Sequence, residues 1–296
     1  MPSLEKELFE ALEKKNVRKV RELLDRGVDP NIQYEHGLTP LHIASGLGHP
    51  NLVKLLLKYG ANPNVQNVAF PEIKIFGDIP LPKNDGYTPL HFAVQGGYAK
   101  IIKILVKHGA NLNTVSNNGL SPLHLATILG KVKVVETLLK LGADPNIYKE
   151  NKIAKSTRRD LTESFHGYTP LHLVILLSDT PHLRRSAVKI IKKLLKYGAN
   201  PDILSDYGWL PLNTAILLEN VKIIKILLKH GADPNKRDKN GCTSLHIAKI
   251  LKRGNLVKIL LKYGADDSIP DTECKNNLKK LKDEEIVLPC AFGIDL

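Results

Sequence analysis

A six-residue pattern, Thr/Ser-Pro-Leu-His-x-Ala, recurs along the chain and constrains its fold more than any other feature. It is complete in TPLHIA, TPLHFA and SPLHLA, and altered in TPLHLV, LPLNTA and TSLHIA. A hydroxyl residue followed by Pro predicts a helix start, because the hydroxyl caps a free backbone N–H and Pro is tolerated at the first helical position. The six copies begin at Thr39, Thr88, Ser121, Thr169, Leu210 and Thr243.

The stretch Gly119–Asn146 contains one copy of the pattern and the residues that complete its structural unit. It predicts a short apolar helix from Pro122 to about Leu129 and a second, amphipathic helix from about Lys131 to Leu141. Gly142 is placed to end the second helix in the left-handed conformation that glycine adopts at least cost. Neither helix is long enough to be stable alone in water, so the unit must pack on copies of itself.

The spacing of the copies identifies the kind of repeat. Their starts are separated by 49, 33, 48, 41 and 33 residues. A glycine lies 21 residues after five of the starts and 29 residues after Thr169, whose repeat holds eight extra residues. A period of 33 residues with this motif resembles the ankyrin repeat. The resemblance covers roughly residues 3–285 and implies an all-α solenoid of helix-turn-helix repeats joined by β-turn fingers. Because ankyrin arrays serve many unrelated binding tasks, it implies a binding scaffold without naming the partner.

The resemblance divides the chain into three parts. Residues 3–36 are predicted to be a divergent N-terminal capping repeat, in which Glu and Lys replace apolar residues of the motif. Residues 37–270 hold the six ankyrin repeats. Residues 271–296 are predicted to be a partial C-terminal cap, with its first helix at Asn276–Leu281, followed by an apolar tail over 286–296 to which we assign no role.

Three insertions interrupt the repeats. The first, near 67–82, is apolar, and two interpretations stay open: a loop packed on its own repeat, or an arm that contacts the partner. The second, near 149–165, is polar and basic, which suits a solvated loop or a contact for an acidic partner. The third, near 178–185, is predicted to lengthen the turn between the two helices of the fourth repeat.

The last two repeats depart from the pattern. Leu210 stands where the capping Thr is expected, and Asn213 stands where the motif has His. Because leucine has no capping oxygen, we expect the fifth repeat to open more easily than its neighbours. In the sixth repeat, Ser244 replaces Pro.

The recurrent histidines and the three cysteines are the residues that suggest chemistry. We expect His42, His91, His124, His172 and His246 to be structural, because packed helices hold equivalent residues about 8–10 Å apart, too far for two imidazoles to share one metal ion. Cys242, Cys274 and Cys290 show no paired spacing and are interpreted as free thiols of a reducing compartment. No catalytic motif is present, so the prediction is a non-enzyme with no cofactor and no metal site.

Lysines form a second recurrent pattern. One lies two residues before each closing glycine, and in five repeats another lies one turn earlier. Lysine at a helix C-terminus complements the helix dipole, but like charges four residues apart repel, so stability does not explain both. With a formal net charge of +13 the chain is expected to attract polyanions weakly. Two interpretations stay open: a solvated face, or a surface for nucleic acid or anionic membrane.

The positions that the motif leaves free are our candidate binding residues. In ankyrin proteins the residue after each finger glycine and the pair after the first-helix motif face the concave side. In this chain many of them are large and apolar, which predicts a partner-binding stripe from Leu120 to Ile250. The alternative is that one member of each pair turns into the core. The predicted contact residues are Tyr87, Leu120, Ile128, Leu129, Tyr168, Leu176, Leu177, Trp209, Leu217, Leu218 and Ile250.

The sequence therefore predicts a non-enzymatic scaffold that binds a protein partner through its concave groove and fingers. We expect a monomer in the cytoplasm, because no apolar run is long enough to span a membrane and the N-terminus lacks the apolar core of a signal peptide. The alternatives are an electrostatic binder of nucleic acid or anionic membrane, and an effector of an intracellular bacterium or virus that acts on a host protein.

Overall fold

The computed structural model describes residues 4–68, 85–148 and 167–283, and all regular structure within these ranges is helical. The all-α prediction is therefore confirmed. The chain divides into two compact units, Met1–Ile147 and Tyr148–Leu296, which are called the N-terminal and C-terminal units below.

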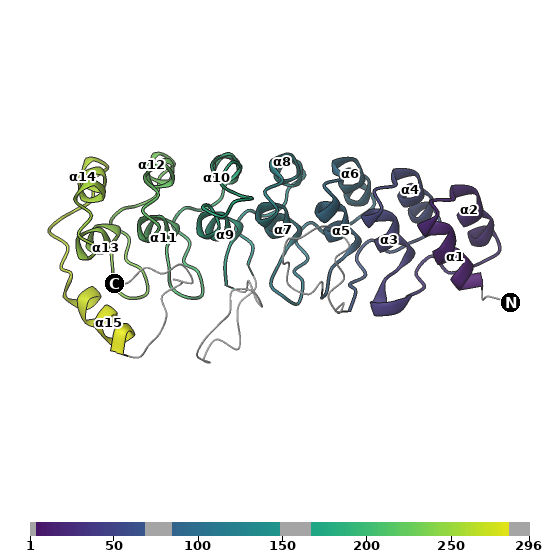
Figure 1. Cartoon of the computed structure of the whole chain (residues 1–296), viewed down its shortest axis with the longest axis horizontal. Helices are drawn as coiled ribbons and strands as arrows, with labels where there is room; N and C mark the ends of the chain where they lie inside the picture. The colour runs from purple at the N-terminus through teal and green to yellow at the C-terminus, as the bar shows by residue number, and fades with distance from the viewer. Residues whose placement is uncertain (1–3, 69–84, 149–166, 284–296) are drawn as a thin grey trace. The chain divides into compact units, whose positions relative to one another are not determined.

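The N-terminal unit is a two-layer stack of helix pairs (Figure 1). The first helices of the pairs contact one another in succession, α1 with α3, α3 with α5 and α5 with α7, and the second helices do the same. A one-turn 3₁₀ helix, η1, precedes α3. The elements are α1 (Leu4–Glu13), α2 (Val17–Asp25), η1 (Glu35–Gly37), α3 (Pro40–Gly46), α4 (Pro50–Lys58), α5 (Pro89–Gly96), α6 (Ala99–Lys107), α7 (Pro122–Ile128) and α8 (Val132–Lys140).

The C-terminal unit repeats this plan and ends in a longer helix. Its first helices α9, α11 and α13 contact one another in succession, and α10, α12 and α14 form the second row in Figure 1. The elements are α9 (Pro170–Leu176), α10 (Ala187–Lys196), α11 (Pro211–Leu217), α12 (Val221–Lys229), α13 (Ser244–Ile250), α14 (Gly254–Lys262) and α15 (Thr272–Asp283).

The pair α7–α8 shows why these residues form these elements. Ser121 caps α7 by accepting a hydrogen bond from the His124 N–H at 3.3 Å, and Pro122 is the first helical residue. Beyond α8, Gly142 has a φ of +95°, the left-handed conformation predicted for it. The apolar face of α8 buries Val134, Val135, Leu138 and Leu139 against the rest of the stack. Burial of this face, rather than helix propensity, holds so short a helix.

The fingers between pairs are tight turns that stack on one another. Trp209 donates its backbone N–H to Ser205 Oγ at 3.1 Å, and Gly208 between them has a φ of +84°. A Cβ at Gly208 would lie 2.2 Å from Cβ of Lys239 in the following finger. Glycine is therefore required here twice, by the positive φ and by the close approach of the next repeat.

Both ends of the chain carry modified units. Helix α1 buries Leu8, Phe9 and Leu12 on one face and leaves charged residues exposed on the other. The C-terminal helix α15 begins at Thr272 rather than at the predicted Asn276.

The predicted insertions fall mostly outside the described residues. Residues 69–82 of the first insertion, the second insertion at 149–165 and the tail 286–296 are not described. In the fourth repeat, α9 ends at Leu176 and α10 begins at Ala187, and Leu183 is buried in the turn between them.

Candidate protein-binding surface

The finger residues that we predicted to face a partner are buried instead. Tyr87, Leu120, Tyr168 and Trp209 are each at most 5% exposed, which corrects the expectation that these finger residues face a partner. Each of these residues directly precedes a helix N-cap, where it packs between neighbouring turns. In the C-terminal unit, for example, the Tyr168 ring stacks on Tyr207 of the next finger with centroids 4.8 Å apart.

The two residues that follow each first-helix motif differ in burial, as the alternative interpretation described. The first member of each pair, Ile128, Leu176 or Leu217, is at most 6% exposed and belongs to the core, which corrects the expectation that both members face a partner. The second member is the C-cap residue of its helix and is partly exposed. These second members are Leu129 in the N-terminal unit and Leu177 and Leu218 in the C-terminal unit.

The C-terminal unit continues this series with one more leucine. Leu251 is the C-cap of α13 and is partly exposed, as is Ile250 just before it. Because α9, α11 and α13 pack side by side, their C-caps lie at the same end of neighbouring helices. We call Leu177, Leu218, Ile250 and Leu251 the leucine row. It is what remains accessible of the predicted apolar stripe within this unit.

Four of the five recurrent histidines, His42, His91, His172 and His246, are fixed by hydrogen bonds on both ring nitrogens. The Thr39 backbone N–H donates to His42 Nδ1 at 3.1 Å, so Nε2 carries the proton and donates to the Tyr87 carbonyl at 3.0 Å. The second bond links one repeat to the next. The same link joins His91 to Leu120, His172 to Trp209 and His246 to Ile269, at 3.0–3.1 Å. These bonds give the histidines a structural role, as predicted, because they join each helix start to the next finger.

Burial keeps the imidazoles of His42, His91 and His172 neutral. It lowers the pKa of His42 to about 4 and that of His172 to about 4, and the hydrogen bonds to finger carbonyls only partly oppose this effect. The pKa of His91 falls to about 3, because it is buried and also close to His42 and His124. A proton on Nδ1 would point at the N–H of the capping residue, so the charged form fits neither the environment nor the bonds.

Asn213 makes a different link in place of the histidine bond. Its amide Nδ2 donates to Asp238 Oδ2 at 3.0 Å, and its Oδ1 accepts from the Ser244 hydroxyl at 2.6 Å. All three side chains are buried. Helix α11, which begins with this departure from the motif, has no side-chain hydrogen bond at its N-cap Leu210. Asn213, Asp238 and Ser244 thus form one buried polar cluster between repeats five and six.

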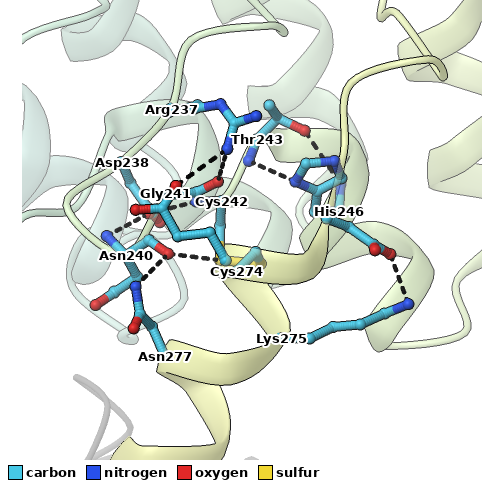
Figure 2. The surroundings of a disulfide bond; sticks show 12 residues. Arg237, Asp238, Asn240, Gly241, Cys242, Thr243, His246, Cys274, Lys275 and Asn277 are labelled. Carbon is cyan, nitrogen blue, oxygen red and sulfur yellow. Dashed lines mark hydrogen bonds and ion pairs between the residues drawn. A yellow bond between two sulfur atoms is a disulfide. The ribbon is translucent and has the colours of Figure 1, made fainter.

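A disulfide bond joins the last finger to the C-terminal helix, which corrects the prediction of free thiols at Cys242 and Cys274 (Figure 2). Both cysteines are fully buried, and their Cα atoms are 4.7 Å apart. The sequence held a signal for this pair, namely a separation of 32 residues, close to one repeat period. Equivalent positions of successive repeats are neighbours in a stack, so such a separation brings two side chains together.

Polar contacts around the disulfide fasten the same helix. Asn277 donates to the Asn240 carbonyl at 3.2 Å (Figure 2). Arg237 reaches the Glu273 carboxylate at 3.4 Å and the Pro270 carbonyl at 3.3 Å. His246 adds its bond to the Ile269 carbonyl just before α15. The disulfide and these bonds together hold α15 over the end of the last repeat.

Two other kinds of site have no counterpart among the described residues. These residues contain no cluster of three or more His, Cys, Asp or Glu side chains placed to hold a metal ion. None of the helices in the described ranges has the length and apolar character that crossing a membrane requires.

Stacked helix pairs, glycine-dependent fingers and histidines that bond the next turn define a helical repeat scaffold. A family model described as ankyrin repeats (3 copies) matches residues 73–149 and 182–271, and one described as ankyrin repeats (many copies) matches residues 23–69. The chain belongs to the ankyrin-repeat family. Ankyrin repeats are in general protein–protein interaction modules rather than catalytic domains.

Similar proteins share single stretches of repeats with this chain. An ankyrin repeat protein of Rickettsia felis is 51% identical over 45 residues, 15% of this chain and 17% of its own length. The ankyrin repeat protein FPV240 of Fowlpox virus is 43% identical over 67 residues, 22% of this chain and 16% of its own length. The matches thus span about one sixth of these relatives.

The solved structure of the human ASB11 ankyrin repeat domain is similar over most of its length. It matches with a TM-score of 0.57 and 24% identity, covering 88% of this chain and 99% of that domain. At this identity the likeness supports the fold alone.

Proposed function

We propose that this protein is a non-enzymatic scaffold that binds a partner protein through the leucine row of its C-terminal unit. The observation that carries the proposal is the repeated partial exposure of a leucine at the C-caps of α9, α11 and α13. Isolated surface leucines are common, but apolar side chains in register on adjacent helices form a continuous strip. The partner chemistry that fits is an apolar helix face or an extended segment with apolar side chains.

The experiment is a comparison of two variants of the full chain. Affinity capture with the wild type, followed by mass spectrometry, identifies the partner. The variant Leu177→Asp/Leu218→Asp should then lose at least about tenfold in affinity, because it places two charges in the contact. Leu204→Asp is the matched control, since Leu204 is 38% exposed in a loop of the same unit. Wild-type affinity in the double variant, with normal folding, would refute the proposal.

Substitution of Leu176 or Leu217 would not test this proposal. Both are at most 6% exposed, so a charge there acts on the core and unfolds the unit instead of disrupting the contact. The distinction matters because these residues precede the leucine row by one position.

Monomeric state, location and biological setting belong to the same proposal. We propose a monomer in the cytoplasm that acts on a host protein, and the similarity to ankyrin repeat proteins of Rickettsia felis and Fowlpox virus supports this setting. Because Cys242 and Cys274 form a disulfide, the cysteines do not support the reducing compartment inferred from the sequence. Sedimentation of the purified chain and fractionation of cells that contain it would test state and location; a stable dimer or a secreted protein would contradict them.

A further inference from the structure

The second-row helices of the C-terminal unit carry lysines in a regular two-dimensional array. Each of α10, α12 and α14 presents three exposed positions with the spacing i, i+3, i+7, which places them on one helix face. The three helices lie in one row in Figure 1. Eight of the nine positions are lysine, and the ninth is Asn255. We call the eight the lysine grid: Lys189, Lys192 and Lys196 on α10, Lys222, Lys225 and Lys229 on α12, and Lys258 and Lys262 on α14.

Helix stability does not account for the grid. Of the grid residues, only Lys196, Lys229 and Lys262 lie in the last turn of their helices, where a cation complements the dipole. Lys189 and Lys222 lie in first turns, close to the positive end of the dipole. Lys192–Lys196, Lys225–Lys229 and Lys258–Lys262 are like-charged pairs four residues apart, which destabilise a helix.

The residues that the structure describes do not neutralise the grid either. Helices α10, α12 and α14 contain no acidic residue. Among the described residues, none of the eight lysines takes part in a salt bridge. The N-terminal unit differs, because its α8 carries Glu136 at the equivalent position, and Glu136 pairs with Lys140 at 3.1 Å. Helices α4 and α6 of the N-terminal unit carry lysines at the same positions, but Glu136 interrupts the series at α8. In the C-terminal unit the series runs over three helices without an acidic residue.

We propose that the lysine grid is a docking surface for an anionic phospholipid membrane. A plane of anionic headgroups can meet all three helices at once, whereas a nucleic acid duplex would follow one line of the array. Lysine acts as a point charge without the fixed fork of arginine, which suits diffuse attraction to a charged surface. Leu261, which is 43% exposed on α14 next to Lys262, adds the apolar contact that interfacial helices use. The grid helices present no aromatic side chain on which bases could stack.

The test uses the full chain and vesicles of phosphatidylcholine with or without about 30 mol % phosphatidylserine. The wild type should bind the anionic vesicles and not the neutral ones, and binding should weaken as salt is raised. The variant Lys192→Glu/Lys225→Glu/Lys258→Glu should lose at least about 100-fold in affinity, at about fivefold for each positive charge removed. It should fold normally, because each new Glu precedes a Lys by four residues, as Glu136 precedes Lys140.

The matched control makes the same change of charge in the N-terminal unit. The variant Lys54→Glu/Lys103→Glu/Lys133→Glu should retain binding within about tenfold. Equal losses in both variants would show that only net charge matters and would overturn the proposal. Tighter binding of duplex DNA than of vesicles, abolished by the grid variant, would assign the grid to nucleic acid and would also overturn it. So would the absence of any preference for anionic vesicles.

Discussion

The side-chain amide of Asn213 donates a 3.0 Å hydrogen bond to the buried carboxylate of Asp238, where the other repeats use a histidine and a backbone carbonyl. Asparagine is too short to reach the carbonyl of the next finger. Asp238 is longer than the serine found at the equivalent position of two other fingers, Ser116 and Ser205, and so closes the gap. Its Oδ1 still accepts the Cys242 N–H at 3.0 Å, which preserves the finger turn. The replacement of histidine by Asn213 is thus accompanied by the replacement of serine by Asp238, its hydrogen-bond partner.

This pairing predicts energetic coupling between the two sites. Asn213→Ala should lower the free energy of unfolding by about 2–3 kcal/mol, because it removes a hydrogen bond to a charged group and leaves one carboxylate oxygen unsatisfied. Urea denaturation measures the loss. Asp238→Ser keeps a finger hydroxyl of the kind that Ser205 supplies. The double variant Asn213→Ala/Asp238→Ser should therefore lose less free energy of unfolding than the two single variants lose together, by at least about 1 kcal/mol. Strictly additive losses would contradict the pairing.

The histidine links predict a large difference between buried and exposed histidines. His91→Ala should destabilise the protein by about 2–4 kcal/mol, because it removes the contact with the capping Thr88 and the bond to the Leu120 carbonyl and leaves a cavity. The control is His108→Ala on the exposed end of α6, which should change the stability by less than about 0.5 kcal/mol. Thermal and urea unfolding of both variants compare the two effects. Similar losses would mean that the links contribute little.

The lowered pKa values predict acid sensitivity between about pH 6.5 and pH 4. The folded-state pKa values of His42, His91 and His172 are about 4, 3 and 4, below the value of 6.5 in an unfolded chain. The unfolded state therefore binds protons first as pH falls, so the stability present above pH 6.5 is lost progressively below it. Each of the three histidines should lower the free energy of unfolding at pH 5 by about 2 kcal/mol relative to pH 7.

Urea unfolding at pH 7 and pH 5 checks this prediction. Burial raises the pKa of Asp238, which acts in the opposite sense and reduces the net loss. The variant His91→Gln should flatten the pH dependence by removing one of the three titrating groups. Unchanged stability of the wild type from pH 7 to pH 5 would show that the imidazoles titrate normally in the fold.

The Cys242–Cys274 bond predicts that reduction loosens the C-terminal helix. In the chain-entropy description, a loop of this length stabilises a fold by about 3–4 kcal/mol. Reduction, or the change Cys242→Ser/Cys274→Ser, should lower the protection of α15 against hydrogen exchange and leave α9 and α11 unaffected. Cys290→Ser is the matched control and should change nothing. Alkylation of the unreduced, denatured protein should label one cysteine of three; labelling of all three would contradict the bond.

Much of the fold depends on residues that lie close together in the sequence. A capping hydroxyl, Pro at the first helical position and a closing glycine act within one repeat, so Ser121, Pro122 and Gly142 could be assigned their conformations from sequence. The structural role of the histidines could be predicted for the same reason, because their position in the motif is constant. The burial of individual side chains was harder to predict from the sequence. Leu176 and Leu177 are adjacent and chemically identical, yet one belongs to the core and the other to the surface.

The sequence by itself determined the repeat, its period, its helices and its caps, because each depends on interactions within about one period of the chain. Only the tertiary structure decided which apolar residues remain accessible, since that depends on the rotation of each helix against the next. It also decided that Cys242 meets Cys274 and that Asn213 meets Asp238. Those relationships join different repeats, and stacking, rather than any local preference, brings them together.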